Sequence, residues 1–235
     1  DAALERTTAA IAGMVDEAKR GEVLAIAAVG TAGLRIASNR DAVLASIEAR
    51  TSLRIEVISG DEEGRLAYVA ATSGLGLSAG SLVVFDTGGG SSQFTFGHDS
   101  SVDERFSVNV GAVRYTERYK LDGVVSAVVL HAALVAMGGA VTNITAVKHS
   151  LASYDPAIVQ GTVLDRAEID RQIELYRSRD ADGRRTIVGL QPKRAEVILA
   201  GACIVRTVME KLGKQSLTVS DRGLRHGVLA ERFGG

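Results

Sequence analysis

Apolar residues recur along the first third of the chain at two spacings, one typical of helices and one typical of strands. The acidic triplet after Ser59 suits the first turn of a helix, because negative charge is favourable at the amino end of the helix dipole. Strand and helix alternate in this part of the chain, which predicts an α/β layer. The pattern places strands at residues 23–29 and 54–58, and helices at residues 4–20, at 39–50 with Asn39 as N-cap, and from Ser59 onward.

The rest of the chain combines a β-meander with a longer run of helices. Asp165 is followed three residues later by Glu168, a variant of the capping box that marks a helix start. Strands are expected at residues 81–85, 93–97, 104–110, 134–137 and 217–220, and helices at residues 112–120, 126–134, 142–151, 165–179, 193–212 and 224–232.

The glycine-rich segment 86–92 carries the strongest chemical signal. An apolar strand ends on Asp86, three glycines and two serines follow, and a second strand then resumes. Glycine has no Cβ, so its backbone N–H can approach an anion closely, and a neighbouring carboxylate can hold a divalent cation that bridges phosphate oxygens. The segment therefore predicts a phosphate-binding hairpin. A plain glycine-rich turn is the alternative that the segment alone leaves open.

Composition narrows the function classes. Hydrophobic residues make up 46% of the 235, enough for a sizeable core, and a net charge of −1 gives no basic footprint for duplex nucleic acid. The single cysteine, Cys203, excludes an internal disulfide, is expected to pack as a small hydrophobe, and suits a reducing cytoplasm. A membrane span is not expected within residues 123–147, which contain His131, Asn143 and the pair Gly138 and Gly139. The four histidines show no metal-ligand spacing.

Seven blocks in order resemble one family, the exopolyphosphatases and guanosine pentaphosphate phosphohydrolases (Ppx/GppA), a branch of the actin/Hsp70/sugar-kinase superfamily. Together they extend over nearly the whole chain. The blocks are residues 31–35 (TAGLR), 56–65 (EVISGDEEGR), 86–92 (DTGGGSS), 109–114 (NVGAVR), 138–142 (GGAVT), 194–201 (RAEVILAG) and 219–227 (VSDRGLRHG).

The resemblance implies an α/β fold of two actin-like, ribonuclease H-like domains with a phosphate site between them. Residues 1–62 are expected to be the remainder of a first domain that is incomplete at its N-terminus, residues 63–223 the second domain, and the helix 224–235 a segment that can pack on the first. The family opens with an Asp-x-Gly-Ser-Asn-Ser turn that supplies a first phosphate loop. This chain starts at Asp1 without that turn, as a fragment would, and residues are also expected to be missing near 133–134.

The resemblance also assigns roles to single residues. Spacing alone favours helix-start capping as the role of Glu63, but the resemblance reverses this: Glu63 aligns with the catalytic glutamate that orients or deprotonates the attacking water. Glu62 is expected to be a cap. Gln93 stands where many relatives have a glutamate that assists the metal or water, and a half-exposed strand residue is its alternative reading. Asp86 is expected to hold Mg²⁺. Phosphate contacts are expected from Arg35, Gly88, Gly89, Gly90, Ser91, Ser92, Gly138, Gly139 and Arg194, with Arg225 a weaker candidate; Arg177, Arg179, Arg184 and Arg185 are expected on a solvated face.

The function predicted from these residues is a Mg²⁺-dependent phosphohydrolase that releases the terminal phosphate of inorganic polyphosphate or of pppGpp. The sequence does not separate the two substrates. A non-catalytic sensor of polyphosphate or (p)ppGpp and an ATP-dependent kinase of the same superfamily are the alternatives. A cytoplasmic protein that forms a homodimer, with no duplex nucleic acid and no membrane as partner, completes the prediction.

Overall fold

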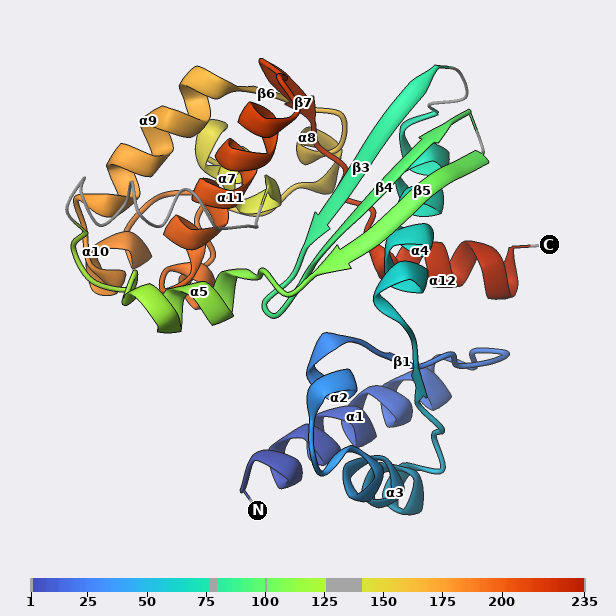
Figure 1. Ribbon diagram of the computed structural model, residues 1–235. Coiled ribbons are helices and arrows are strands. Elements are labelled where there is room, and N and C mark those ends of the chain that lie inside the picture. Colours follow the sequence, from blue (N-terminus) through green and yellow to red (C-terminus); the bar gives the residue numbers. More distant parts are fainter. Residues whose placement is uncertain (1, 77–79, 100, 126–140, 235) are drawn as a thin grey trace.

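A computed structural model describes residues 2–76, 80–99, 101–125 and 141–234. Figure 1 shows three parts: a mainly helical N-terminal lobe, a twisted three-stranded sheet with two helices beside it, and a helical lobe on the other side of the sheet. The tip of the sheet approaches the N-terminal lobe, and the candidate site lies there.

The N-terminal lobe contains less strand than the sequence predicts. Of the two predicted strands, only Val29 from the first and Glu56 and Val57 from the second pair, in parallel, with Val29 opposite Glu56 and Gly30 opposite Val57. The prediction of a buried strand over residues 23–29 is wrong for most of its length, because Leu24 is fully exposed and residues 23–28 have no neighbouring strand within the described residues. An apolar run becomes a strand only where a partner satisfies its backbone. Asn39 precedes a helix as predicted but forms no side-chain cap. The elements are α1 (Ala2–Arg20), β1 (Val29–Gly30), α2 (Ala32–Ile36), α3 (Arg40–Thr51) and β2 (Glu56–Val57).

Helix α4 (Gly60–Leu75) and the sheet confirm the sequence prediction closely. The Ser59 hydroxyl accepts a hydrogen bond from the Glu62 N–H at 3.0 Å, so the helix begins where the sequence places it. The sheet is an antiparallel meander, and its register sets Asp86 opposite Gln93 and Gln93 opposite Ser107. Its strands are β3 (Ser81–Thr87), β4 (Ser92–His98) and β5 (Ser101–Val108).

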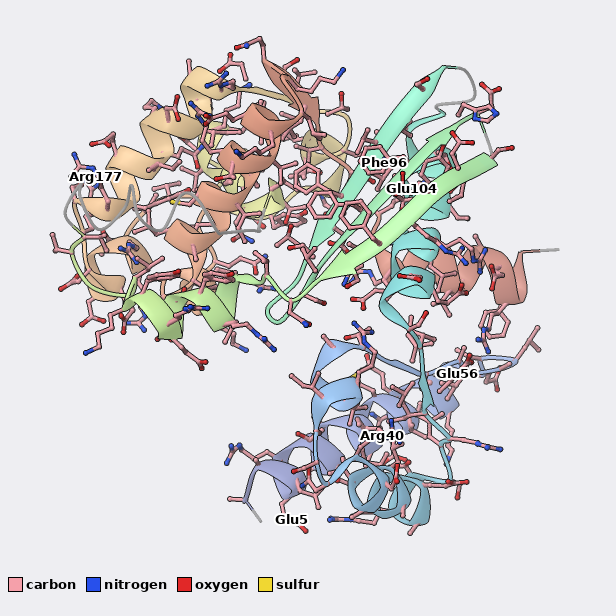
Figure 2. All side chains as sticks on the ribbon, viewed as in Figure 1. Glu5, Arg40, Glu56, Phe96, Glu104 and Arg177 are labelled. Atoms are coloured by element: carbon pink, nitrogen blue, oxygen red, sulfur yellow. The ribbon has the colours of Figure 1, made fainter. Side chains whose placement is uncertain are left out.

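The two faces of the sheet pack against different parts of the molecule. Phenylalanine rings stack across one face, and two of them, Phe85 and Phe94, pack on the core of the helical lobe; Phe96, labelled in Figure 2, belongs to this row. The opposite face lies against α4. A Cβ at Gly64 of that helix would stand 2.9 Å from Thr95 Oγ1, so glycine is what lets the helix approach the sheet so closely.

The helical lobe holds the main core, and Cys203 is fully buried in it as predicted. Helix α11 is apolar on nearly every side but starts five residues later than predicted, because residues 192–194 form a 3₁₀ turn before it. The Asp165 carboxylate caps α9 by accepting from the Glu168 N–H at 2.8 Å, as predicted. The elements are α5 (Ala112–Tyr119), α7 (Val141–Lys148), α8 (Pro156–Val159), β6 (Val163–Asp165), α9 (Arg166–Arg177), α10 (Ala181–Arg185), η1 (Pro192–Arg194), α11 (Ile198–Lys211) and β7 (Ser216–Thr218).

The last helix, α12 (Leu224–Phe233), lies beside α4 and links it to the N-terminal lobe (Figure 1). Val228 packs with Leu66 of α4 and with Ile58, which follows β2. Arg232 forms an ion pair with Glu56 of β2, the residue labelled in Figure 2. The helix thus contacts the first predicted domain, and the division of the chain at residues 62 and 63 stays a prediction.

Several predicted features lie outside the described residues: the helix at 126–134, the strand at 134–137, and the pair Gly138 and Gly139. No helix in the described ranges is both long and apolar enough to cross a membrane.

The prediction that Arg184 lies on a solvated face is wrong. Arg184 is fully buried. Its guanidinium donates to four carbonyl oxygens, at 2.7 Å to Tyr176 and Leu121, 2.8 Å to Gly123 and 3.3 Å to Ala195. The carbonyls come from three separate segments, so Arg184 ties together the end of α9, the chain after α5 and the turn before α11.

Replacing Arg184 by Met is expected to lower the free energy of unfolding by about 2–3 kcal/mol, since the aliphatic volume is kept but four buried carbonyls lose their donor. Urea denaturation measures the change. Arg185→Met is the matched control, because the neighbouring side chain is exposed and pairs with Asp182 and Glu196; its expected cost is about 0.5 kcal/mol or less. Equal costs for the two variants would contradict this role for Arg184.

Candidate active site

The tip of the β3–β4 hairpin is held by helix α5. The Gly88 N–H closes the turn by donating to the Ser91 carbonyl at 2.9 Å. The Gly88 carbonyl accepts from Ala112 N–H at 3.0 Å, and the Gly89 carbonyl accepts from Val113 and Arg114 at 3.1 and 3.2 Å. The hairpin carbonyls therefore satisfy the free N–H groups of the first turn of α5.

This arrangement fixes where the glycine N–H groups point. In a trans peptide the C=O and the following N–H point in opposite directions. Because the carbonyls of Gly88 and Gly89 face α5, the N–H groups of Gly89 and Gly90 face away from it, and neither has an acceptor within the described part of the chain. Gly90 lies next to α2, since a Cβ on it would be 3.5 Å from the Cβ of Ala32. Adjacent N–H groups that have no acceptor in the described part of the chain are the kind of donor pair that can bind an anion.

Glu63, in the first turn of α4, forms an ion pair with Arg35 of α2. Arg35 Nη1 lies 2.8 Å from Glu63 Oε2 and also donates to the Ile58 carbonyl at 3.0 Å. The side chains are 21% and 11% exposed, so the pair is partly shielded from water. Burial raises the pKa of Glu63 above its ordinary 4.5, and Arg35 opposes the rise. Glu62 instead pairs with Arg65, away from this contact.

Asp86 is the second carboxylate of the site. Its charge raises the pKa of Glu63 further, so the two carboxylates interact. Burial raises the pKa of Asp86 itself, and only the Thr87 N–H opposes the rise. Asp86 has no cationic partner among the described side chains, which fits a place beside a metal ion. The described residues hold no cluster of three or more His, Cys, Asp or Glu.

Gln93 is buried rather than half-exposed, with 1% of its surface accessible. Its Nε2 donates to the hydroxyls of Ser91 at 2.7 Å and Ser107 at 3.2 Å. The sequence alone gives Ser107 no role. The register of the meander, which sets Ser107 opposite Gln93, identifies it as part of the site. The structure thus brings Gln93, Asp86 and the start of α4 to one end of the sheet.

The remaining predicted phosphate contacts are placed differently. The Ser92 hydroxyl donates to the Val110 carbonyl at 2.7 Å, which leaves it an internal role in the hairpin. Arg194 lines a pocket together with Asp86, Thr87 and Gly88, on the helical-lobe side of the hairpin. Arg225 is exposed on α12. Phosphate binding by these residues stays a prediction.

Fold and site together define an α/β protein with a glycine-rich hairpin beside an acidic helix start. The sequence pattern of the Ppx/GppA phosphatase family matches residues 1–234, and the chain therefore belongs to that family. It is 28% identical to Exopolyphosphatase 2 of Mycobacterium tuberculosis, over 85% of this chain and 72% of that protein. It is 31% identical to the guanosine-5'-triphosphate,3'-diphosphate pyrophosphatase of Photobacterium profundum, over 86% of this chain and 44% of that protein. A bifunctional 3-dehydroquinate synthase/phosphatase of Fusobacterium nucleatum is 25% identical over 86% of this chain and 34% of its own length.

Solved structures confirm the predicted fold class. A Ppx/GppA family member from Aquifex aeolicus superposes with a TM-score of 0.84 at 28% identity, over 97% of this chain and 80% of that one. An exopolyphosphatase-like protein superposes with a TM-score of 0.89 at 26% identity, over 99% and 84%. The chain has the α/β fold of this family. It spans between about a third and three quarters of the three relatives named above.

Arg35→Met is expected to lower kcat/KM for phosphate release about tenfold at neutral pH. It is also expected to move the acid limb of the pH profile of kcat/KM to higher pH. The reason is that Arg35 is the cation that opposes the burial-induced rise in the Glu63 pKa, so without it the carboxylate ionises only at higher pH. Arg40→Met is the control: Arg40, labelled in Figure 2, pairs with Asp41 in the same lobe. An acid limb that moves to lower pH in Arg35→Met would contradict the argument.

Proposed function

We propose that this protein is a phosphohydrolase that releases the terminal phosphate of inorganic polyphosphate, of pppGpp, or of both. The observation that carries the proposal is that the N–H groups of Gly89 and Gly90 have no acceptor among the described residues, and that Gly90 lies next to α2, the helix whose Arg35 pairs with Glu63. A terminal phosphate needs donors for its oxygens and a base for the attacking water, and this arrangement supplies both.

The chemistry follows from the geometry. The N–H groups of Gly89 and Gly90, with the guanidinium of Arg35, bind the terminal phosphate. Water attacks its phosphorus, the P–O bond to the next phosphate breaks, and the water proton passes to the Glu63 carboxylate. The products are orthophosphate and a polyphosphate or nucleotide one phosphate shorter. Glu63 then loses its proton to solvent.

Asp86 would hold the divalent cation of the site, which we propose is Mg²⁺. Bound beside the phosphates, such an ion neutralises their charge. Buried carboxylates with raised pKa values bind protons and cations in competition, so metal affinity is expected to weaken as pH falls. A homodimer in the cytoplasm, acting in the stringent response where pppGpp is the substrate, completes the proposal.

The test is phosphate release by the full-length protein from polyphosphate and from pppGpp, each with Mg²⁺ and with EDTA. The expected result is metal-dependent release from at least one of the two. Tight binding of either compound by calorimetry without any release would replace the proposal with the sensor function. Phosphorylation of an acceptor at the expense of ATP would replace it with a kinase, which no observation on the described residues favours.

A further inference from the structure

One polar atom in the candidate site has no partner although it is buried. Gln93 Oε1 is inaccessible to solvent and receives no hydrogen bond within the described ranges, while the Nε2 of the same amide donates twice. A buried acceptor left unpaired is costly, and in native proteins it commonly marks a place for a water, an ion or a catalytic contact. The amide is therefore satisfied at one end and free at the other.

The contact with Ser107 determines which end of the Gln93 amide has no partner within the described ranges. Its hydroxyl on β5 accepts from Nε2 at 3.2 Å, on the side of the central strand opposite to Asp86 of β3. Ser91 accepts from the same nitrogen at 2.7 Å. With both acceptors taken by Nε2, the carbonyl end of the amide is the end that lies away from Ser91 and Ser107. The amide of a glutamine is asymmetric, so anchoring one end presents a defined atom at the other.

Ser107 is also packed against the start of α4. A Cβ on Gly60 would stand 2.4 Å from Ser107 Cβ, and the same position is 3.7 Å from Arg35 Nη2. Glu63 follows three residues later on this helix. Ser107 therefore lies between the helix start that carries the proposed base and the amide of Gln93, although the sequence gives it no catalytic character.

We propose that Ser107 is a positioning residue: it holds the Gln93 amide so that Oε1 accepts a hydrogen bond from the water that Glu63 activates. This inference rests on the proposed phosphohydrolase function. A glutamine carbonyl that orients an attacking water is an established device in phosphoryl transfer. Ser107 touches neither substrate nor water, and it acts only through the orientation of Gln93.

The test is a double-mutant cycle of Ser107→Ala and Gln93→Glu in the full-length protein. A carboxylate has an acceptor oxygen at each end, so in the Gln93→Glu background the orientation no longer matters, and the two serine hydroxyls can turn to donate. Ser107→Ala is expected to lower kcat about fivefold alone and less than twofold in the Gln93→Glu background. Thermal unfolding of all four proteins and the Ser101→Ala variant, at the far end of β5, control for a general effect on the sheet.

Equal losses in both backgrounds would mean that Ser107 is merely structural, and no loss in the native background would mean that it does not hold the amide; either overturns the inference. A second readout does not depend on turnover. In ¹⁵N spectra, the side-chain NH₂ of Gln93 is expected to exchange slowly with water, and Ser107→Ala is expected to speed that exchange about fivefold or more. Unchanged exchange overturns the positioning role. Absence of phosphate release from the native protein would instead overturn the proposed function.

Discussion

Glu63→Gln is expected to lower kcat for phosphate release by about 10³-fold, with KM changed less than threefold. The amide keeps the shape of the side chain and can still accept from Arg35, but it cannot take the proton of the attacking water. General-base catalysis contributes about 10²–10⁴-fold in enzymes that use it. Steady-state phosphate release with the better of the two substrates gives the number.

Glu62→Gln is the matched control for this variant. Glu62 is the neighbouring acid in the same helical turn, but it pairs with Arg65, so its loss is expected to change kcat less than twofold. If Glu63→Gln retains more than a tenth of native activity, or Glu62→Gln is equally damaging, the assignment of the base is wrong.

Unfolding does not explain the expected loss. Burial raises the pKa of Glu63 above 4.5, so the folded protein binds a proton at this site more tightly than the unfolded chain does. The stabilisation from this group is fully present below pH 4.5 and is lost as the pH rises through the raised value. At neutral pH the charged carboxylate has already lost it, so replacing it with a neutral amide is not expected to lower the free energy of unfolding. Urea denaturation at two pH values checks this.

The sequence predicted best what local chemistry decides. The helix start at Ser59 and the cap at Asp165 each need only a hydrogen bond between residues three positions apart, and both hydrogen bonds are present. The hairpin at residues 86–92 follows from glycines between two alternating segments, and the register then places Gln93 opposite Asp86. Such features are decided by neighbours in the chain.

Long-range partners account for what the sequence missed. The strand predicted over residues 23–29 needs a neighbouring strand that most of it lacks. Arg184 reads as one more charged residue in a polar stretch until carbonyls from distant segments converge on it. The contact between Ser107 and Gln93 depends on the pairing of β4 with β5, and a shift of one residue would send the serine to the other face. The sequence predicted a glycine-lined phosphate hairpin but not why its N–H groups face away from α5. The reason is that the carbonyls of Gly88 and Gly89 accept hydrogen bonds from the first turn of α5.

That dependence on α5 makes Gly111 the residue whose change is expected to damage phosphate binding most. Gly111 precedes the helix in an extended conformation that any residue adopts, so its backbone angles do not require glycine. Space does. A Cβ on Gly111 would stand 2.3 Å from the Gly89 carbonyl oxygen and 2.6 Å from the Gly90 nitrogen, and both neighbours are backbone atoms that cannot rotate away.

Gly111→Ala is therefore expected to push the hairpin tip off the start of α5 and to lower kcat/KM by at least about 10²-fold, because displacing preorganised N–H donors costs roughly this much per donor. The free energy of unfolding is expected to fall by about 1–3 kcal/mol, as in other overpacked sites. Gly13→Ala, where a Cβ meets no atom within 4 Å, is the control and should retain full activity. Calorimetric titration with pyrophosphate separates binding from turnover: affinity lost in Gly111→Ala but kept in Glu63→Gln is the expected pattern. If Gly111→Ala binds pyrophosphate as the native protein does, the hairpin N–H groups are not what holds the phosphate.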